Sequence, residues 1–172
     1  MSLLKPTIAL NRVTDITYEM LKELNIDAIL LDVDNTLAPP SSQVPYIGAK
    51  SWIDEIKAHG IHIVICSNNF KKRVKPFSDS MGLECVSMSL KPTPFGFIRA
   101  KNKLKEKPDN VLVVGDQIFT DVLGANLGGM KSVLLRPQSE EHGFTIMLRR
   151  KMEKRTRHQL GYPIDNFNEG KE

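Results

Sequence analysis

Short apolar runs alternate with stretches of helical spacing along most of this chain. The apolar runs contain β-branched residues, which is typical of buried strands. They cover residues 29–31, 61–66, 84–88, 111–114 and 132–135. Between them, apolar residues recur at helical spacing, and this predicts helices at about 17–24, 49–59, 74–81, 95–104 and 120–127. The alternation favours an α/β fold, a doubly wound and mostly parallel five-stranded sheet with helices on both faces.

The first apolar run ends in two carboxylates, Asp32 and Asp34. Desolvation and mutual repulsion of two acids at the mouth of a buried strand oppose stability, so the pair indicates a metal site or acid–base chemistry. Two other interpretations fit this stretch alone. One is a strand that has reached water, where Asp-Asn is common turn chemistry. The other is a calcium loop of the EF-hand type, which needs Gly at its sixth position, where this chain has Leu37.

Polar residues also follow the next three strands, namely Ser67, Lys91 and Asp116. Each has a simple explanation by itself, as a loop residue, a solvated charge or a turn. Right-handed crossovers, however, bring the carboxyl ends of parallel strands to one edge of the sheet, and such sheets bind ligands there. Four strands that end in such residues together indicate a functional site.

Composition sets outer bounds on the fold and the location. A chain of 172 residues with 41% hydrophobic and 26% charged residues is expected to form one globular domain. It has no apolar run of about 18 residues that could span a membrane. Residues 1–10 do not form a secretory signal, so we expect a cytoplasmic protein. Cys66 and Cys85 are expected to be reduced core thiols, and the four histidines form no ligand cluster.

The positive charge of the chain is concentrated near its end. Residues 149–157 hold six basic side chains and one acid, a local charge of +5, whereas the whole chain carries +4. The rest of the chain therefore sums to −1, which does not suit a nucleic-acid-binding body.

The polar motifs, in this order, resemble the haloacid dehalogenase-like (HAD) phosphohydrolase superfamily. The resemblance spans about 28–126 and includes D-x-D-x-T at 32–36, Ser67, Lys91-Pro92 and G-D-x-x-x-T-D at 115–121. The Ser-Asn-Asn after the second strand is similar to subclass IIIA phosphatases, in particular to bacterial relatives of mitochondrial phosphatidylglycerophosphate phosphatase.

The resemblance implies a Mg²⁺-dependent phosphomonoester hydrolase that acts through an aspartyl phosphate. Asp32 would be the nucleophile, and Asp34 would protonate the leaving group and later activate water. The implied metal ligands are Asp32, the backbone carbonyl of Asp34, and Asp116, with Asp121 acting mainly outside this set.

The resemblance also implies the residues that bind the phosphoryl group. Lys91 would neutralise its oxygens, and Ser67, Thr36 and Asn68 would hydrogen-bond them.

The spacing of the motifs leaves no room for a sizeable cap domain. About 30 residues separate Asp34 from Ser67, and about 23 lie between Ser67 and Lys91. An open site suits a phosphate presented on something large, such as a lipid head group, and the resemblance suggests phosphatidylglycerophosphate. Three alternatives stay open: another phosphorylated substrate, a receiver-like domain that is itself phosphorylated, and a non-catalytic scaffold.

The C-terminal extension, residues 137–172, has two interpretations. Phe144, Met147, Leu148 and Met152 recur at helical spacing before the end of the basic run. The first interpretation is a helix packed on the sheet with a solvated basic end. The second is an interfacial segment that rests peripherally on an anionic membrane. Its basic residues would be Arg149, Arg150, Lys151, Lys154, Arg155 and Arg157.

Overall fold

The centre of the fold is a six-stranded sheet in which all neighbouring strands are parallel, in the order β1-β6-β5-β2-β3-β4. The computed structural model describes residues 3–104, 107–139 and 144–162, apart from the side chains of residues 94, 101, 103 and 144–150. The strands are β1 (Ile8–Leu10), β2 (Ala28–Leu31), β3 (His62–Cys66), β4 (Glu84–Val86), β5 (Val111–Gly115) and β6 (Lys131–Leu135). The predicted α/β class and parallel sheet are confirmed.

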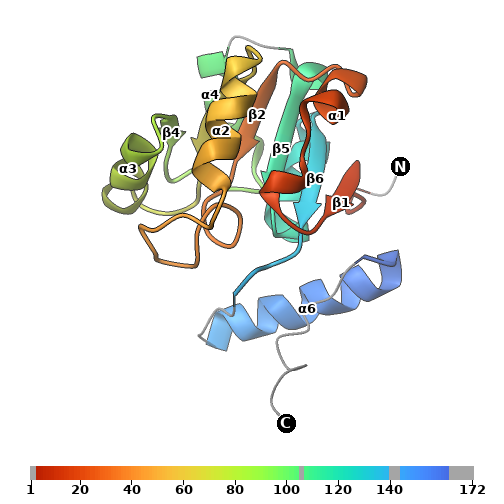
Figure 1. Cartoon of the computed structure of the whole chain (residues 1–172). Coiled ribbons are helices and arrows are strands. Elements are labelled where there is room, and N and C mark those ends of the chain that lie inside the picture. The colour runs from red at the N-terminus through yellow and green to blue at the C-terminus, as the bar shows by residue number, and fades with distance from the viewer. Residues whose placement is uncertain (1–2, 105–106, 140–143, 163–172) are drawn as a thin grey trace.

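Helices cover both faces of this sheet (Figure 1). The helices are α1 (Tyr18–Glu23), α2 (Ala49–Ala58), α3 (Lys71–Ser80), α4 (Pro94–Leu104), α5 (Leu123–Leu127) and α6 (Phe144–Leu160). Short helical turns lie at η1 (Val13–Asp15), η2 (Pro108–Asn110) and η3 (Ile118–Val122), of which η3 has π-helical geometry. One core cluster packs α1, α2 and α3 on one face, and a second packs α4 and α5 on the other.

Strand β2 lies in the middle of the sheet, and Asp32 follows directly at its carboxyl end. Its four residues are fully buried, and they pair with β3 on one side and β5 on the other. A strand buried on both faces must be apolar throughout, which explains its sequence Ala-Ile-Leu-Leu. The chain reverses its direction of travel across the sheet beside β2, and this is where such folds bind ligands.

The prediction of five strands was wrong, because β1 adds a sixth at the edge of the sheet. This strand has three residues, and Ile8 lies beside Val133 of β6. A run this short has no visible period, and its partner is far along the chain. The expected helix at 120–127 likewise begins earlier, as η3, and continues as α5.

Helix α6 crosses the carboxyl edge of the sheet (Figure 1). Its side chains bond the chain at the ends of β5 and β6. Within residues 3–104, where the structure describes every backbone position, α2 is the one helix between β2 and β3 and α3 the one helix between β3 and β4, so neither connection contains a cap domain. None of the helices that the structure describes combines the length and apolarity needed to cross a bilayer.

Candidate active site

Three carboxylates meet where β2 and β5 end. Asp32 follows β2, Asp116 follows β5 and Asp121 lies in η3, and one oxygen of each lies within 4.8 Å of the others. The register of the sheet brings them together, because the Asp32 N–H donates to the Val114 carbonyl at 2.9 Å. Gly115 leaves the necessary space, since a Cβ there would lie 2.2 Å from the Asp121 Cγ.

Lys91 is the cation of this cluster. Its Nζ lies 3.0 Å from Oδ1 of Asp32 and 2.6 Å from Oδ1 of Asp121, and the side chain is buried. Burial alone would lower the pKa of Lys91, but the carboxylates of Asp121 and Asp32 outweigh it and hold the pKa above its usual range. Lys91 is therefore an ammonium ion bound between two acids.

The three acids of the cluster are shielded from water. Asp32, Asp116 and Asp121 are all buried, and Lys91 pairs with Asp32 and Asp121. Burial, with a contribution from the nearby Asp32, raises the pKa of Asp121 to about 6, although the charge of Lys91 opposes the rise. One oxygen of each acid converges on the same point, and such hard oxygen ligands suit a cation like Mg²⁺.

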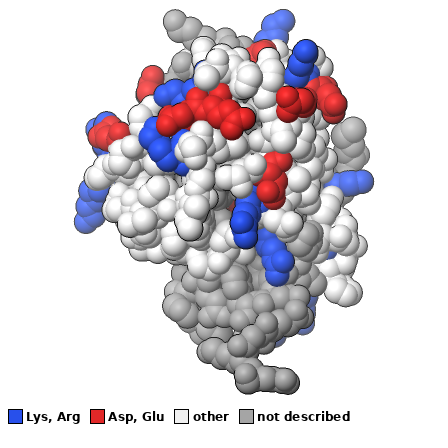
Figure 2. Space-filling view, viewed as in Figure 1, with Lys and Arg blue, Asp and Glu red and all other residues white. Residues whose placement is uncertain are grey.

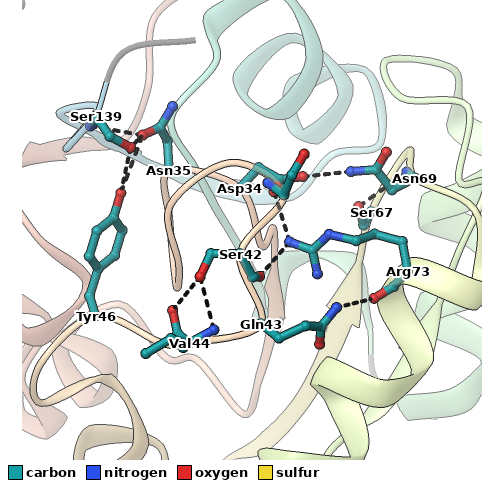
Figure 3. Close-up of polar contacts among 11 residues, drawn as sticks. Asp34, Asn35, Ser42, Gln43, Val44, Tyr46, Ser67, Asn69, Arg73 and Ser139 are labelled. Atoms are coloured by element: carbon teal, nitrogen blue, oxygen red, sulfur yellow. Dashed lines mark hydrogen bonds and ion pairs between the residues drawn. The ribbon is translucent and has the colours of Figure 1, made fainter.

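Asp34 bonds residues of the loop after β2 and of the segment at the start of α3 (Figure 3). Its Oδ1 accepts hydrogen bonds from the Ser41 N–H at 3.0 Å and from Nη2 of Arg73 at 3.1 Å. Its Oδ2 accepts from the Asn69 side chain at 2.6 Å. Burial raises the pKa of Asp34 above its ordinary value; Ser41 and Arg73 oppose the rise, and the charge of Asp32 adds to it.

Asn68 supports Lys91 from the loop after β3. Its Oδ1 accepts from the Lys91 N–H at 2.7 Å, and its Nδ2 donates to the Lys91 carbonyl at 3.0 Å. The hydroxyl of Ser89 donates to the same Oδ1 at 2.8 Å. Both polar atoms of the side chain predicted to bind phosphate are thus engaged with the segment that carries Lys91.

Ser67 and Thr36 are both buried; Ser67 directly follows β3, and Thr36 lies in the turn after β2. The Ser67 Oγ accepts from the Asn69 N–H at 3.2 Å. The Thr36 Oγ1 is buried and has no hydrogen-bond partner among the described residues. Such a group is costly unless something else bonds it, so Thr36 remains available to a ligand.

Arg73 is a site residue that the sequence analysis missed. Its Nη2 joins Asp34 to the Ser42 carbonyl, at 3.1 and 2.7 Å, and its own carbonyl accepts from Gln43 at 3.1 Å (Figure 3). A signal was present in the helical spacing: Arg73 lies four residues before Phe77, a core residue, and so shares its inward face. Its two basic neighbours, Lys71 and Lys72, are exposed.

Asn35 ties the turn after β2 to two distant segments. Its Oδ1 accepts from the Tyr46 hydroxyl at 3.3 Å and from the N–H and hydroxyl of Ser139, at 3.0 and 2.8 Å (Figure 3). The turn requires a φ of 59° at this position, a left-handed value that Asn tolerates better than most residues. The turn after β2 is therefore held against the chain near residues 46 and 139.

Comparison with known proteins finds phosphatases among the relatives of this chain. A family model described as Mitochondrial PGP phosphatase matches residues 1–138. The chain is 38% identical over 143 residues to "Probable phosphatase YqeG" of Bacillus subtilis (strain 168), with 81% of each chain covered. It is 24% identical over 158 residues to "Phosphatidylglycerophosphate phosphatase 1, chloroplastic/mitochondrial" of Arabidopsis thaliana, which covers 86% of this chain and 45% of that protein.

Solved structures of low sequence identity share the fold. An uncharacterized protein from Listeria monocytogenes serotype 4b superposes with a TM-score of 0.56 at 19% identity, covering 69% of this chain and 86% of that one. The cobalt-bound deoxy-D-mannose-octulosonate 8-phosphate phosphatase of Haemophilus influenzae gives a TM-score of 0.52 at 12% identity, covering 65% and 69%. The receiver-like and scaffold interpretations are therefore set aside. The chain belongs to the Mitochondrial PGP phosphatase family and is a phosphatase of the haloacid dehalogenase type.

Proposed function

We propose that the protein hydrolyses phosphomonoesters in two displacements at Asp32, with Mg²⁺ bound by Asp32, Asp116 and the backbone carbonyl of Asp34. The observation that carries this proposal is the buried cluster of three carboxylates and Lys91 at the end of the central strand. When bound, the cation neutralises charge on the phosphoryl oxygens that would otherwise repel a carboxylate. Asp121 would stay paired with Lys91 and keep that side chain in place.

The two displacements use Asp32 and Asp34 in different roles. A carboxylate oxygen of Asp32 attacks phosphorus, and the bond from phosphorus to the leaving oxygen breaks as Asp34 gives that oxygen a proton. Water then attacks the aspartyl phosphate while Asp34 takes its proton, which returns Asp32 and releases phosphate. The raised pKa of Asp34 supports this role, because an acid that holds its proton at higher pH is a better donor near neutrality.

The phosphoryl oxygens would be bound by Lys91, Ser67 and Thr36. Lys91 supplies positive charge from a buried position, and the buried Oγ1 of Thr36 gains a partner. For Asn68 we favour an indirect role, holding the backbone of Lys91.

The test of the mechanism is turnover of an aryl phosphate by purified variants. Asp32→Asn is expected to abolish nearly all activity while the protein stays folded, because it removes charge repulsion from the cluster. The matched control is Asp54→Asn, since Asp54 is an exposed acid on α2 and should retain wild-type turnover. Wild-type turnover by Asp32→Asn would overturn the proposal.

For the substrate, we propose a phosphorylated lipid head group, with phosphatidylglycerophosphate as the first candidate. One relative carries that activity in its name. A second support is a rim of apolar side chains, each at least half exposed, on the loops after β2, β3 and β4 and at the start of α4. The rim consists of Val44, Ile47, Phe70, Met88, Leu90 and Phe95.

The loops that carry the rim are bonded to one another, and their charges suit an anionic lipid surface. The hydrogen bonds between these loops run from Arg73 to Ser42 and from the Met88 N–H to the Asn69 carbonyl. Figure 2 shows acidic side chains over α1 and α2 but none over the loop between β2 and α2. Exposed basic residues follow the rim at Lys71 and Lys72.

The basic segment of α6 is exposed only in part. Lys151, Lys154 and Arg155 are exposed, as the membrane interpretation requires. Arg157 is buried and cannot meet a lipid, which corrects its place among the six basic residues. The side chains of Arg149 and Arg150, and of the predicted apolar stripe at 144–148, lie outside the described residues.

Sedimentation with vesicles tests the lipid proposal. The wild type should bind anionic but not zwitterionic vesicles, and high salt should weaken the binding. Ile47→Ser and Phe70→Ser should reduce binding and turnover of phosphatidylglycerophosphate in vesicles, yet leave aryl phosphate turnover unchanged. Leu127→Ser is the control, because Leu127 is an exposed apolar residue at the end of α5, near the opposite edge of the sheet. If neither Ile47→Ser nor Phe70→Ser changes vesicle binding or turnover of phosphatidylglycerophosphate, the lipid proposal is wrong and the phosphatase has another substrate.

A further inference from the structure

Helix α6 directs two charged side chains into the protein. Glu153 and Arg157 lie one helical turn apart, and each is 2% exposed. The Arg157 Nε and the Glu153 Oε2 are 3.8 Å apart. Buried charges are tolerated when they are paired and hydrogen-bonded, so the hydrogen-bond partners of the two residues indicate what these residues do.

Both residues bond the backbone of the loop that carries Asp116. The two carboxylate oxygens of Glu153 accept from the N–H groups of Ile118 and Phe119, at 3.0 and 2.9 Å. These N–H groups open η3 and have no partner within that turn. Nη2 of Arg157 donates to the carbonyl of Asp116 at 2.5 Å. The pair therefore holds the backbone on both sides of Gln117.

Arg157 also connects this loop to the rest of the sheet edge. The same Nη2 donates to the carbonyl of Leu135, the last residue of β6, at 3.0 Å. Further along, Leu160 and Tyr162 pack against an apolar cluster formed by Ile118, Val122 and Leu134. The helix is thus fixed to the site by buried polar contacts and by apolar packing.

The direction of two site carboxylates depends on the backbone that these contacts hold. Asp116 is the first residue of the segment that Glu153 and Arg157 bond. Asp121 follows it in η3, where its Oδ2 accepts from the Gln117 N–H at 3.2 Å. A rotation of the peptide after Asp116 would break the bond from Arg157 and move the Asp116 carboxylate relative to Asp32.

We propose that Glu153 and Arg157 are positioning residues that orient Asp116 toward the bound cation. Helix α6 is then part of the active site, although it lies beyond the residues 1–138 that the family model matches. This inference rests on the proposed function, because it takes Asp116 as a ligand of the cation. Residues that orient metal ligands affect metal affinity more directly than substrate affinity.

The test is Mg²⁺ binding to full-length Glu153→Gln and Arg157→Met, measured by titration calorimetry without substrate. Each variant should bind Mg²⁺ about tenfold more weakly, and the Mg²⁺ needed for half-maximal turnover should rise in parallel. The KM for an aryl phosphate at saturating Mg²⁺ should stay close to that of the wild type. Arg157→Lys keeps a cationic donor and should recover part of the loss.

Two control variants separate positioning from stability. Lys154→Gln changes an exposed charge of the same helix. Leu160→Ala removes apolar packing of α6 against the cluster that includes Ile118, and should lower the urea midpoint while the polar contacts of Glu153 and Arg157 stay in place. Both should bind Mg²⁺ as the wild type does. The proposal is overturned if folded Glu153→Gln also binds Mg²⁺ with wild-type affinity, or if Leu160→Ala weakens binding as much as the two test variants.

A third variant separates this inference from the function on which it rests. Asp116→Asn should weaken Mg²⁺ binding strongly if Asp116 is a ligand. If Asp116→Asn has no effect, the proposed metal site is wrong. If Asp116→Asn weakens binding but Glu153→Gln and Arg157→Met do not, the metal site stands and only the role of α6 fails.

Discussion

Replacing Lys91 with Met should destabilise the protein strongly, because it leaves two buried carboxylates without their counterion. Lys91 lies 3.0 Å from Asp32 and 2.6 Å from Asp121. An ion pair at about 4 Å contributes about 4 kcal/mol at an effective dielectric constant of 20, and the relieved desolvation of Lys91 offsets part of this. Removing one partner of a buried pair typically costs about 3–5 kcal/mol, and we expect a loss in this range.

Urea unfolding in EDTA measures this loss. With a slope of about 2 kcal/mol per molar urea, the midpoint of Lys91→Met should fall by about 2 M. The matched control is Lys50→Met. Lys50 pairs with Asp54 at 2.6 Å, but both side chains are about half exposed, so the midpoint should hardly change.

Mg²⁺ gives the same experiment a second readout. The cation would bind the carboxylates that Lys91 leaves uncompensated, and it would no longer be repelled by the ammonium group. Mg²⁺ should therefore raise the midpoint of Lys91→Met more than that of the wild type. The reasoning is refuted if Lys91→Met unfolds within about 0.5 M of the wild type in EDTA, or if Mg²⁺ stabilises both proteins equally.

Three further predictions concern the metal, the thiols and a glycine. EDTA should abolish aryl phosphate turnover and millimolar Mg²⁺ should restore it; full activity after dialysis against EDTA would contradict this. Ca²⁺ should inhibit, because the looser coordination of Ca²⁺ lets the nucleophilic carboxylate bind the ion through both oxygens. Burial raises the pKa of the Cys66 thiol to about 11, so iodoacetamide at pH 8 should label only the partly exposed Cys85 in the native protein and both cysteines in urea, as read by peptide mass spectrometry. Gly115→Ala should displace the Asp121 carboxylate, lower kcat by about tenfold or more and cost about 1–3 kcal/mol in urea unfolding; unchanged kcat would show that the position of Asp121 is not critical.

The sequence allowed us to predict the central strands and the acids that follow them, because burial in the sheet determines both. Strands β2 and β5 are buried on both faces, and such strands are visible as continuous apolar runs. Once these strands are parallel neighbours, Asp32 and Asp116 must lie at the same edge. Strand β1 was not predictable in this way, because three residues show no period and their partner in β6 lies far along the chain.

The inward residues of α6 were hidden for a different reason. An acid and a base four residues apart in a basic helix look like a solvated face, so residues 149–157 suggested only exposed charge. What buries Glu153 and Arg157 is a set of backbone N–H and carbonyl groups at 116–119 and 135. The pattern of side chains in a sequence does not indicate which backbone groups lack partners within their own turn. Only the folded structure therefore shows that Glu153 and Arg157 are buried against such groups.

The strand order has a consequence for how the protein is made. Every neighbouring pair in the sheet is parallel, and two pairs, β1 with β6 and β2 with β5, join strands that are far apart in the chain. This gives a high contact order and slow folding. Ala28 pairs with Val111, which leaves the ribosome 83 residues later. At cellular rates of synthesis this delay is roughly 4–17 s. During this time the apolar strand β2 lacks its neighbour β5. Asp32 is thus among the first residues of the site to be synthesised and among the last to acquire its surroundings.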